Sequence, residues 1–198
     1  MGNLGTLQAE KMLSFEELNQ EFDNFDLPSP IVTPICQNNV EEYIDPSHSD
    51  TSKCIRINFD NLKSFEVVER QYESWGVIFN NSLAIQPSNP AFPTNSGATV
   101  LMASPKNGVL EVIFLEPVAW VSALVTSSQP LIFSAYNKTG QLLTQSTLPT
   151  ANLANSDSAM SPNTLLSLEA KDIKSVTFCA FDGQFTIDEF RFCFSSLA

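Results

Sequence analysis

Residues 108–143 read GVLEVIFLEPVAWVSALVTSSQPLIFSAYNKTGQLL, and their alternation of apolar and polar side chains constrains the fold more than any other feature. A period of two predicts strands, and each run ends at residues suited to turns. Proline has no backbone N–H for a ladder, and glycine accepts positive φ angles. We therefore expect an antiparallel meander with strands at residues 109–115, 119–126 and 131–137, followed by the start of a fourth at Gln141. The breaks between them are Glu116-Pro117, residues 127–130 and residues 137–140.

Similar short runs lie on both sides of this stretch. They occupy residues 54–59, 65–68, 75–79, 82–85 and 99–103 before it, and residues 165–168, 174–181 and 184–194 after it. The last two are predicted to form a hairpin around Asp182-Gly183, and polar loops are expected at residues 86–98 and 146–164. About eight to ten strands with almost no helix signal predict an all-β fold, an antiparallel two-sheet β-sandwich (jelly roll) spanning residues 54–198.

The charge of the chain argues against some classes of partner. It has 22 acidic and 10 basic residues, a formal net charge of −12, and ten of the acids fall within residues 1–53. The basic residues are scattered, so they form no cluster that could neutralise several phosphates. No apolar run reaches the roughly 18 residues of a membrane helix. We expect neither nucleic acid nor a membrane span.

The chain carries four cysteines with neither a C-x-x-C pair nor a histidine at ligand spacing: Cys36, Cys54, Cys179 and Cys193. This spacing argues against zinc. The expected final hairpin does not place Cys179 opposite Cys193, so we expect buried free thiols and a reducing compartment. The first residues lack the basic and apolar regions of a secretion signal. A cytoplasmic location is therefore expected, and the alternative is the cell surface, reached without a signal peptide.

Residues 1–53 are predicted to be an acidic, proline-containing tail or linker with one short amphipathic helix near residues 14–25. Ser14 and Glu17 form a capping box. Four apolar residues then share one helical face: Phe15, Leu18, Phe22 and Phe25. Because so short a helix is marginal alone in water, it either packs on its own domain, folds into a partner protein's groove, or stays unfolded. Partner binding by these four residues is our expectation.

Four segments carry a resemblance to known domains: Ile57-Asn58-Phe59-Asp60; residues 71–79, QYESWGVIF; residues 114–118 and 134–140, FLEPV and SAYNKTG; and residues 176–178 and 185–190, VTF and FTIDEF. They resemble the jelly-roll domains of bacterial, notably cyanobacterial, surface proteins. That group includes domains preceding PEP-CTERM sorting anchors and relatives of galactose-binding-like carbohydrate modules. The resemblance implies carbohydrate binding or adhesion. It also implies a structural calcium ion held by Asp60 and Asp188.

Aromatic side chains are the first candidates for ligand contact, because sugar rings stack on Trp and Tyr beside polar groups. We expect such contact at four residues: Tyr72, Trp75, Tyr136 and Asn137. Trp120 shares its strand face with Val118, so the alternation predicts that it packs in the core.

The sequence offers no catalytic set. His48 is the only histidine and lies in the linker, while Asp188 and Glu189 are adjacent in a strand and so point to opposite faces. We expect no enzyme, and no cofactor other than the calcium ion. The leading hypothesis is a non-catalytic binding module that the N-terminal segment docks to a larger protein assembly. A carbohydrate-binding or adhesion module is the alternative, and a glycan-active enzyme is a third.

Overall fold

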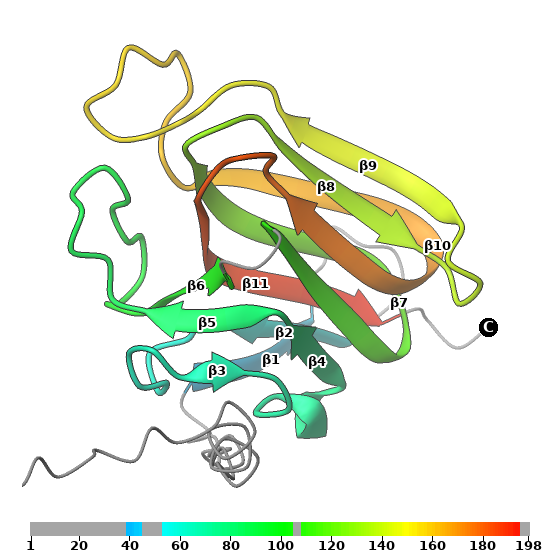
Figure 1. Ribbon diagram of the computed structural model, residues 1–198. Helices are drawn as coiled ribbons and strands as arrows, with labels where there is room; N and C mark the ends of the chain where they lie inside the picture. The colour runs from blue at the N-terminus through cyan, green and yellow to red at the C-terminus, as the bar shows by residue number, and fades with distance from the viewer. Residues whose placement is uncertain (1–38, 45–52, 105–107, 195–198) are drawn as a thin grey trace, which may run out of the picture. The chain divides into compact units, whose positions relative to one another are not determined.

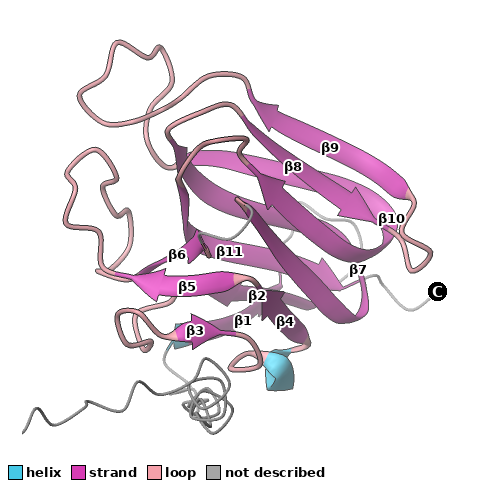
Figure 2. Cartoon of the chain, viewed as in Figure 1, coloured by secondary structure: helices cyan, strands magenta, loops and turns pink. Residues whose placement is uncertain are grey.

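A computed structural model describes residues 39–44, 53–104 and 108–194, all within one of the chain's two units, Val32–Ala198. This part is all-β, with almost no helix, as predicted (Figure 2). Its elements are β1 (Val40–Ile44), β2 (Lys53–Ile57), β3 (Val67–Val68), the 3-10 helix η2 (Glu73–Trp75), β4 (Val77–Asn80), β5 (Ser82–Ile85), β6 (Val100–Ala103), β7 (Val109–Ser127), β8 (Leu131–Tyr136), β9 (Leu142–Leu148), β10 (Thr164–Cys179) and β11 (Phe185–Phe194). None of the helical residues among those described forms a segment long and apolar enough to cross a membrane.

All strand pairs are antiparallel, and the main path through the sheet runs β3-β5-β6-β11-β7-β10-β8-β9. Up to Phe114, β7 pairs with β4 and with the last part of β10, which also pairs with β8. From Val118 onward, β7 pairs with β11 and with the first part of β10. The two long strands therefore belong to both groups of strands, and Figure 1 shows them curving between the groups.

Phenylalanine rings fill the space between these two groups. Phe114 of β7 packs on Phe190 and Phe192 of β11, with ring centroids 6.3 and 5.3 Å apart, and all three side chains are fully buried. Within one group, Phe133 of β8 stacks at 4.2 Å on its ladder partner Phe178 of β10, and Phe178 in turn contacts Phe185 of β11 at 6.4 Å. Burying one such side chain contributes about 1.5–3 kcal/mol. The rings therefore hold the two layers of a β-sandwich together.

The predicted meander is wrong in two respects. β7 is one continuous strand through Glu116 and Pro117, where the pattern predicts a turn. The register between β7 and β10 shifts between Ile113 and Val118, and Pro117 is exposed within this shift. The strand therefore continues through Pro117, although proline has no N–H to donate to the neighbouring strand. In addition, β8 pairs with β9 and β10 rather than with β7.

The predicted hairpin around Asp182-Gly183 is also wrong. Strands β10 and β11 both pair with β7, which lies between them. Turn residues predict where the chain reverses, but they carry no information on which strand the returning segment joins. One strand is an addition: no strand is predicted before Cys54, and β1 pairs with β2 inside the segment predicted as linker.

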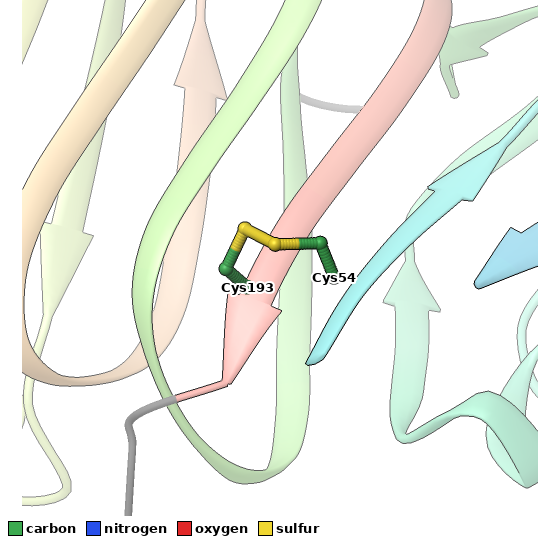
Figure 3. Close-up of a disulfide and its surroundings, with 2 residues drawn as sticks. All are labelled: Cys54 and Cys193. Atoms are coloured by element: carbon green, nitrogen blue, oxygen red, sulfur yellow. A yellow bond between two sulfur atoms is a disulfide. The ribbon is translucent and has the colours of Figure 1, made fainter. Parts of the chain in front are cut away.

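A disulfide bridge joins Cys54 of β2 to Cys193 of β11 (Figure 3). The two residues are directly opposite in the ladder, and both are buried. The prediction of free thiols is therefore wrong for this pair, because the pairing of β2 with β11 brings together residues 139 positions apart. Cys179 is free, as predicted, and Cys36 lies outside the described residues.

Candidate functional site

Two adjoining pockets lie beside the ends of β5 and β10, strand β6 and the start of β11. Their volumes are about 410 and 220 Å³, and they share the lining residues Met102, Gln184 and Phe185. The larger is otherwise lined mainly by the connection between β10 and β11, and the smaller by Phe65 and by residues from the loop after β5. We call the two pockets together the end groove.

Two exposed phenylalanine rings border the end groove, one at each pocket. Phe65 lines only the smaller pocket and is 77% exposed, while Phe181 lines only the larger pocket and is 84% exposed. An aromatic ring exposed at the border of a pocket offers a flat apolar face to a bound molecule. The end groove therefore has a stacking surface at each of its pockets.

The backbone of Phe65 has a φ of +67°, which lies in the left-handed region that residues other than glycine and asparagine rarely adopt. Its N–H donates to the carbonyl oxygen of Ala84 at 2.7 Å, and the Ala84 N–H donates to the carbonyl oxygen of Glu66 at 2.8 Å. These two bonds to β5 hold the strained residue in place. Strained residues of this kind cluster at binding and catalytic sites.

Residues 86–98, which we call the wall loop, are held in place by Asp188 of β11. Both oxygens of its carboxylate accept hydrogen bonds from the loop: Oδ2 from the N–H of Asn95 at 2.6 Å, and Oδ1 from the hydroxyl of Ser96 at 2.7 Å. Burial raises the pKa of Asp188, and these hydrogen bonds oppose that increase. A buried carboxylate thus fixes the loop that lines the smaller pocket.

Asp60 fastens the end of the same loop. Its Oδ1 accepts the backbone N–H groups of Ala98 and Thr99 at 2.8 and 3.2 Å. Gly97 lies directly against this carboxylate: a Cβ added there would come within 1.7 Å of Oδ2, and its φ is +71°. Only glycine fits at this position, because both the close approach and the backbone angle exclude a side chain.

The two predicted calcium ligands therefore bind backbone amides of one loop. N–H groups present positive charge to the oxygens that a cation would use, so an ion there would have to displace these donors. Among the described residues, no group of three or more histidine, cysteine, aspartate or glutamate side chains is arranged to hold a metal. Calcium binding at Asp60 and Asp188 stays a prediction.

Of the four predicted ligand residues, Tyr72 and Trp75 pack against the interior. The Tyr72 ring is fully buried between Phe59 and Phe79, and its hydroxyl donates to Oδ1 of Asn61 at 3.1 Å. Burial raises the pKa of this hydroxyl. A fully buried ring has no face for a ligand, so the expectation for Tyr72 is wrong. Trp75, in η2, is partly buried against the core.

Tyr136 and Asn137 lie at the end of β8 and line neither pocket of the end groove. The Asn137 side-chain oxygen accepts the N–H groups of Thr139 and Gln141, each at 3.0 Å. It thereby closes the turn before β9, which is the usual role of asparagine in a turn. A ligand role for Trp75, Tyr136 and Asn137 stays a prediction.

Trp120 is outside the core, contrary to the prediction. It is half-buried, and it lies opposite Cys193 and Glu169 in the ladder, while its neighbour Val121 is fully buried. The register shift between Val118 and Trp120 changes which side chains share a face, so simple alternation fails there. Trp120 therefore lies on the outer face of the sheet.

The same outer face carries an ionic cluster around Glu189. This carboxylate is only 4% exposed and accepts hydrogen bonds from the guanidinium groups of Arg56, at 2.6 and 2.7 Å, and of Arg191. Arg56 also contacts Glu41 of β1 at 3.0 Å. Asp188 turns instead to the wall loop, so the two adjacent carboxylates have different hydrogen-bond partners. The cluster joins β1, β2 and β11.

The predicted partner-binding residues Phe15, Leu18, Phe22 and Phe25 lie outside the described residues, as does His48. Their docking role stays a prediction.

No protein-family model matches the chain, and no curated protein matches it either. Among solved structures, it is similar to a DUF4465 family protein from Bacteroides caccae, at 10% identity and a TM-score of 0.34, over 79% of this chain and 86% of that one. It is also similar to the CBM22-1 xylan-binding domain of Paenibacillus barcinonensis Xyn10C, at 12% identity and a TM-score of 0.33, over 68% of this chain and 93% of that one.

A third similar structure contains the CBM22-1 and GH10 modules of Clostridium thermocellum xylanase 10B, crystallised with xylohexaose. The identity is 11% and the TM-score 0.36, over 65% of this chain and 27% of the xylanase chain. With identities and TM-scores this low, none of these similarities assigns a function to this chain.

Proposed function

We propose that this chain is a non-catalytic carbohydrate-binding module that holds a glycan in the end groove. The observation that carries the proposal is Phe65, an exposed aromatic ring kept in a strained backbone conformation beside a pocket. Amide side chains of Gln86, Asn89 and Gln184 line the same pocket. Stacking on a ring combined with amide hydrogen bonds is the chemistry by which proteins bind sugars.

An oxidising, extracytoplasmic setting belongs to this proposal. The buried bridge between Cys54 and Cys193 supports it, because disulfides form and persist in oxidising compartments. This revises the cytoplasmic location expected from the sequence, which rested on free thiols.

Affinity electrophoresis through gels that contain single soluble polysaccharides, neutral or acidic, tests the proposal. We expect at least one polysaccharide to retard the wild type and Leu165→Ala, and not to retard the double variant Phe65→Ala/Phe181→Ala. Leu165 is a matched control because it is 58% exposed and lines neither pocket. Unretarded migration of the wild type in every gel would reject glycan binding. Equal retardation of the double variant would reject the end groove as its site.

A further inference from the structure

Among the residues that the structure describes, the lining of the end groove contains no positive charge. The smaller pocket is lined by no ionisable side chain that is charged at neutral pH, and the larger one by a single such group, Asp182. No lysine, arginine or histidine of the described part of the chain borders either pocket. A carboxylated or sulfated sugar would therefore meet no counter-charge from the described lining residues, and it would approach a chain whose net charge is −12. The charge of the lining selects an uncharged ligand.

The polar groups of the lining suit hydroxyl groups. Gln184 borders both pockets, with Gln86 and Asn89 at the smaller one. A side-chain amide both donates and accepts, as a sugar hydroxyl does, so the two pair in either direction. Ser128 fixes the backbone of Gln184 through two hydrogen bonds of 2.9 Å, and the exposed Gln184 lines both pockets. Gln184 is therefore placed to contact a ligand in either pocket.

The dimensions of the groove point to more than one sugar unit. Clefts for drug-sized ligands have volumes of about 300–1,000 Å³. The smaller pocket, at about 220 Å³, falls below that range, while the larger, at about 410 Å³, adjoins it along Met102, Gln184 and Phe185. Each pocket also has its own exposed ring. The pair is built as two subsites that share a wall.

We propose that the end groove binds a neutral oligosaccharide that spans both pockets, with one sugar ring stacked on Phe65, another on Phe181, and hydroxyl groups paired with Gln184 between them. This inference rests on the proposed function and specifies its ligand: its charge, its minimum length and its two stacking positions.

Calorimetric titration with two series of oligosaccharides tests this proposal on the full chain. The neutral series consists of β-1,4-linked glucose, xylose and mannose oligosaccharides of one to six units, and the acidic series of oligogalacturonides of the same lengths. The proteins are the wild type, Phe65→Ala, Phe181→Ala and the control Leu165→Ala. All three substituted side chains are exposed, so the variants should fold, and thermal melting checks this.

We expect the oligosaccharides of at least one of the three neutral sugars to bind, with an affinity that rises with the number of sugar units and then levels off. Each of the substitutions at Phe65 and Phe181 should weaken the longest ligand roughly three- to tenfold. A ligand too short for both pockets should respond to one of them at most, and Leu165→Ala should change nothing.

Tighter binding of the acidic series would overturn the inference, and so would a monosaccharide that binds as tightly as a hexasaccharide. An unchanged affinity for the longest ligand in either Phe65→Ala or Phe181→Ala would overturn the two-subsite arrangement. In all these cases the proposed glycan binding would still hold, because a sugar is bound. Absence of binding across both series would overturn this inference, and the electrophoresis experiment then decides separately whether the proposed glycan binding holds.

Discussion

Removal of the bridge between Cys54 and Cys193 should destabilise the sandwich strongly. The bridge closes a loop of 139 residues, and the loop-closure entropy of an unfolded chain of that length corresponds to about 5 kcal/mol at 25 °C. For a domain of this size, a loss of 1 kcal/mol lowers Tm by about 2–4 °C. We therefore expect reduction of the bridge to lower Tm by about 10–20 °C.

Urea denaturation and thermal melting, with and without a reducing agent, measure this effect. Reduced wild type is the most informative sample, because it keeps both cysteine side chains and loses only the covalent cross-link. The variant Cys54→Ala/Cys193→Ala should be at least as unstable and should not respond to the reducing agent. Cys36→Ala is the common background of all samples and serves as the wild type of this experiment, because it prevents thiol exchange with residue 36.

The control for this experiment is Cys179→Ala, which removes the free thiol and leaves the bridge intact. It should keep the sensitivity of Tm to reduction. Peptide mapping under non-reducing conditions should recover Cys54 linked to Cys193. Equal midpoints for oxidised and reduced wild type would refute the reasoning, as would a linkage of either residue to Cys179.

Three further predictions concern single side chains. Burial raises the pKa of Asp188, so the folded chain loses stability when this carboxyl group ionises. The free energy of unfolding of wild type minus that of Asp188→Asn should therefore fall as the pH rises from about 4, the pKa in the unfolded chain, through the higher pKa in the folded chain. Urea titrations measure this difference, and an increase with pH would contradict the prediction. Phe65→Gly should be about 0.5 kcal/mol more stable than Phe65→Ala. Glycine relieves the strain of the left-handed backbone, about 1–2 kcal/mol, and this gain exceeds the cost of the added flexibility of the unfolded chain, about 0.5–1 kcal/mol. Lower stability of the glycine variant in urea denaturation would show that no strain is stored. Glu189→Gln should lower the free energy of unfolding by about 1.5–3 kcal/mol, because it removes a buried acceptor of charged hydrogen bonds. Glu42→Gln, which breaks the half-exposed pair with Lys53, should lower it by less than about 1 kcal/mol. Equal losses in denaturation experiments would argue against this explanation.

Side-chain alternation was sufficient to predict the strands, but not how they pair. The strand predicted at residues 82–85 coincides with β5, and Ala103 ends both the strand predicted at residues 99–103 and β6. The period-two pattern records one buried face, which is a local property. Which strands lie next to each other depends on contacts between distant residues, such as Cys54 with Cys193. The meander and the final hairpin were therefore wrong although their strands were largely right.

The end groove could not be predicted from the sequence, for a different reason. Phe65 was predicted as the first residue of a strand, but it adopts a left-handed backbone conformation that no neighbouring glycine or asparagine signals. Phe181 stands beside the turn residue Asp182, whose φ is +51°, and an apolar ring next to a turn is the one local hint of exposure. Because the pockets are lined by residues from four connections between strands, their lining follows only from the folded chain.

The bulge in β11 explains how one strand serves both the end groove and the outer face. Ile187 pairs with Val125 of β7 and Phe190 with Ala123, so Asp188 and Glu189 together stand opposite a single residue. Such a bulge bends the strand and redirects its side chains.

Asp188 therefore reaches the wall loop of the groove, while Glu189 reaches the two arginines beside the disulfide. Both carboxylates are buried, and both have their hydrogen-bond partners. The sequence Asp188-Glu189 is thus explained by the architecture: one acid holds the loop that shapes the proposed ligand site, and the next holds β1 and β2 to the sheet. This arrangement needs no catalytic role for either residue.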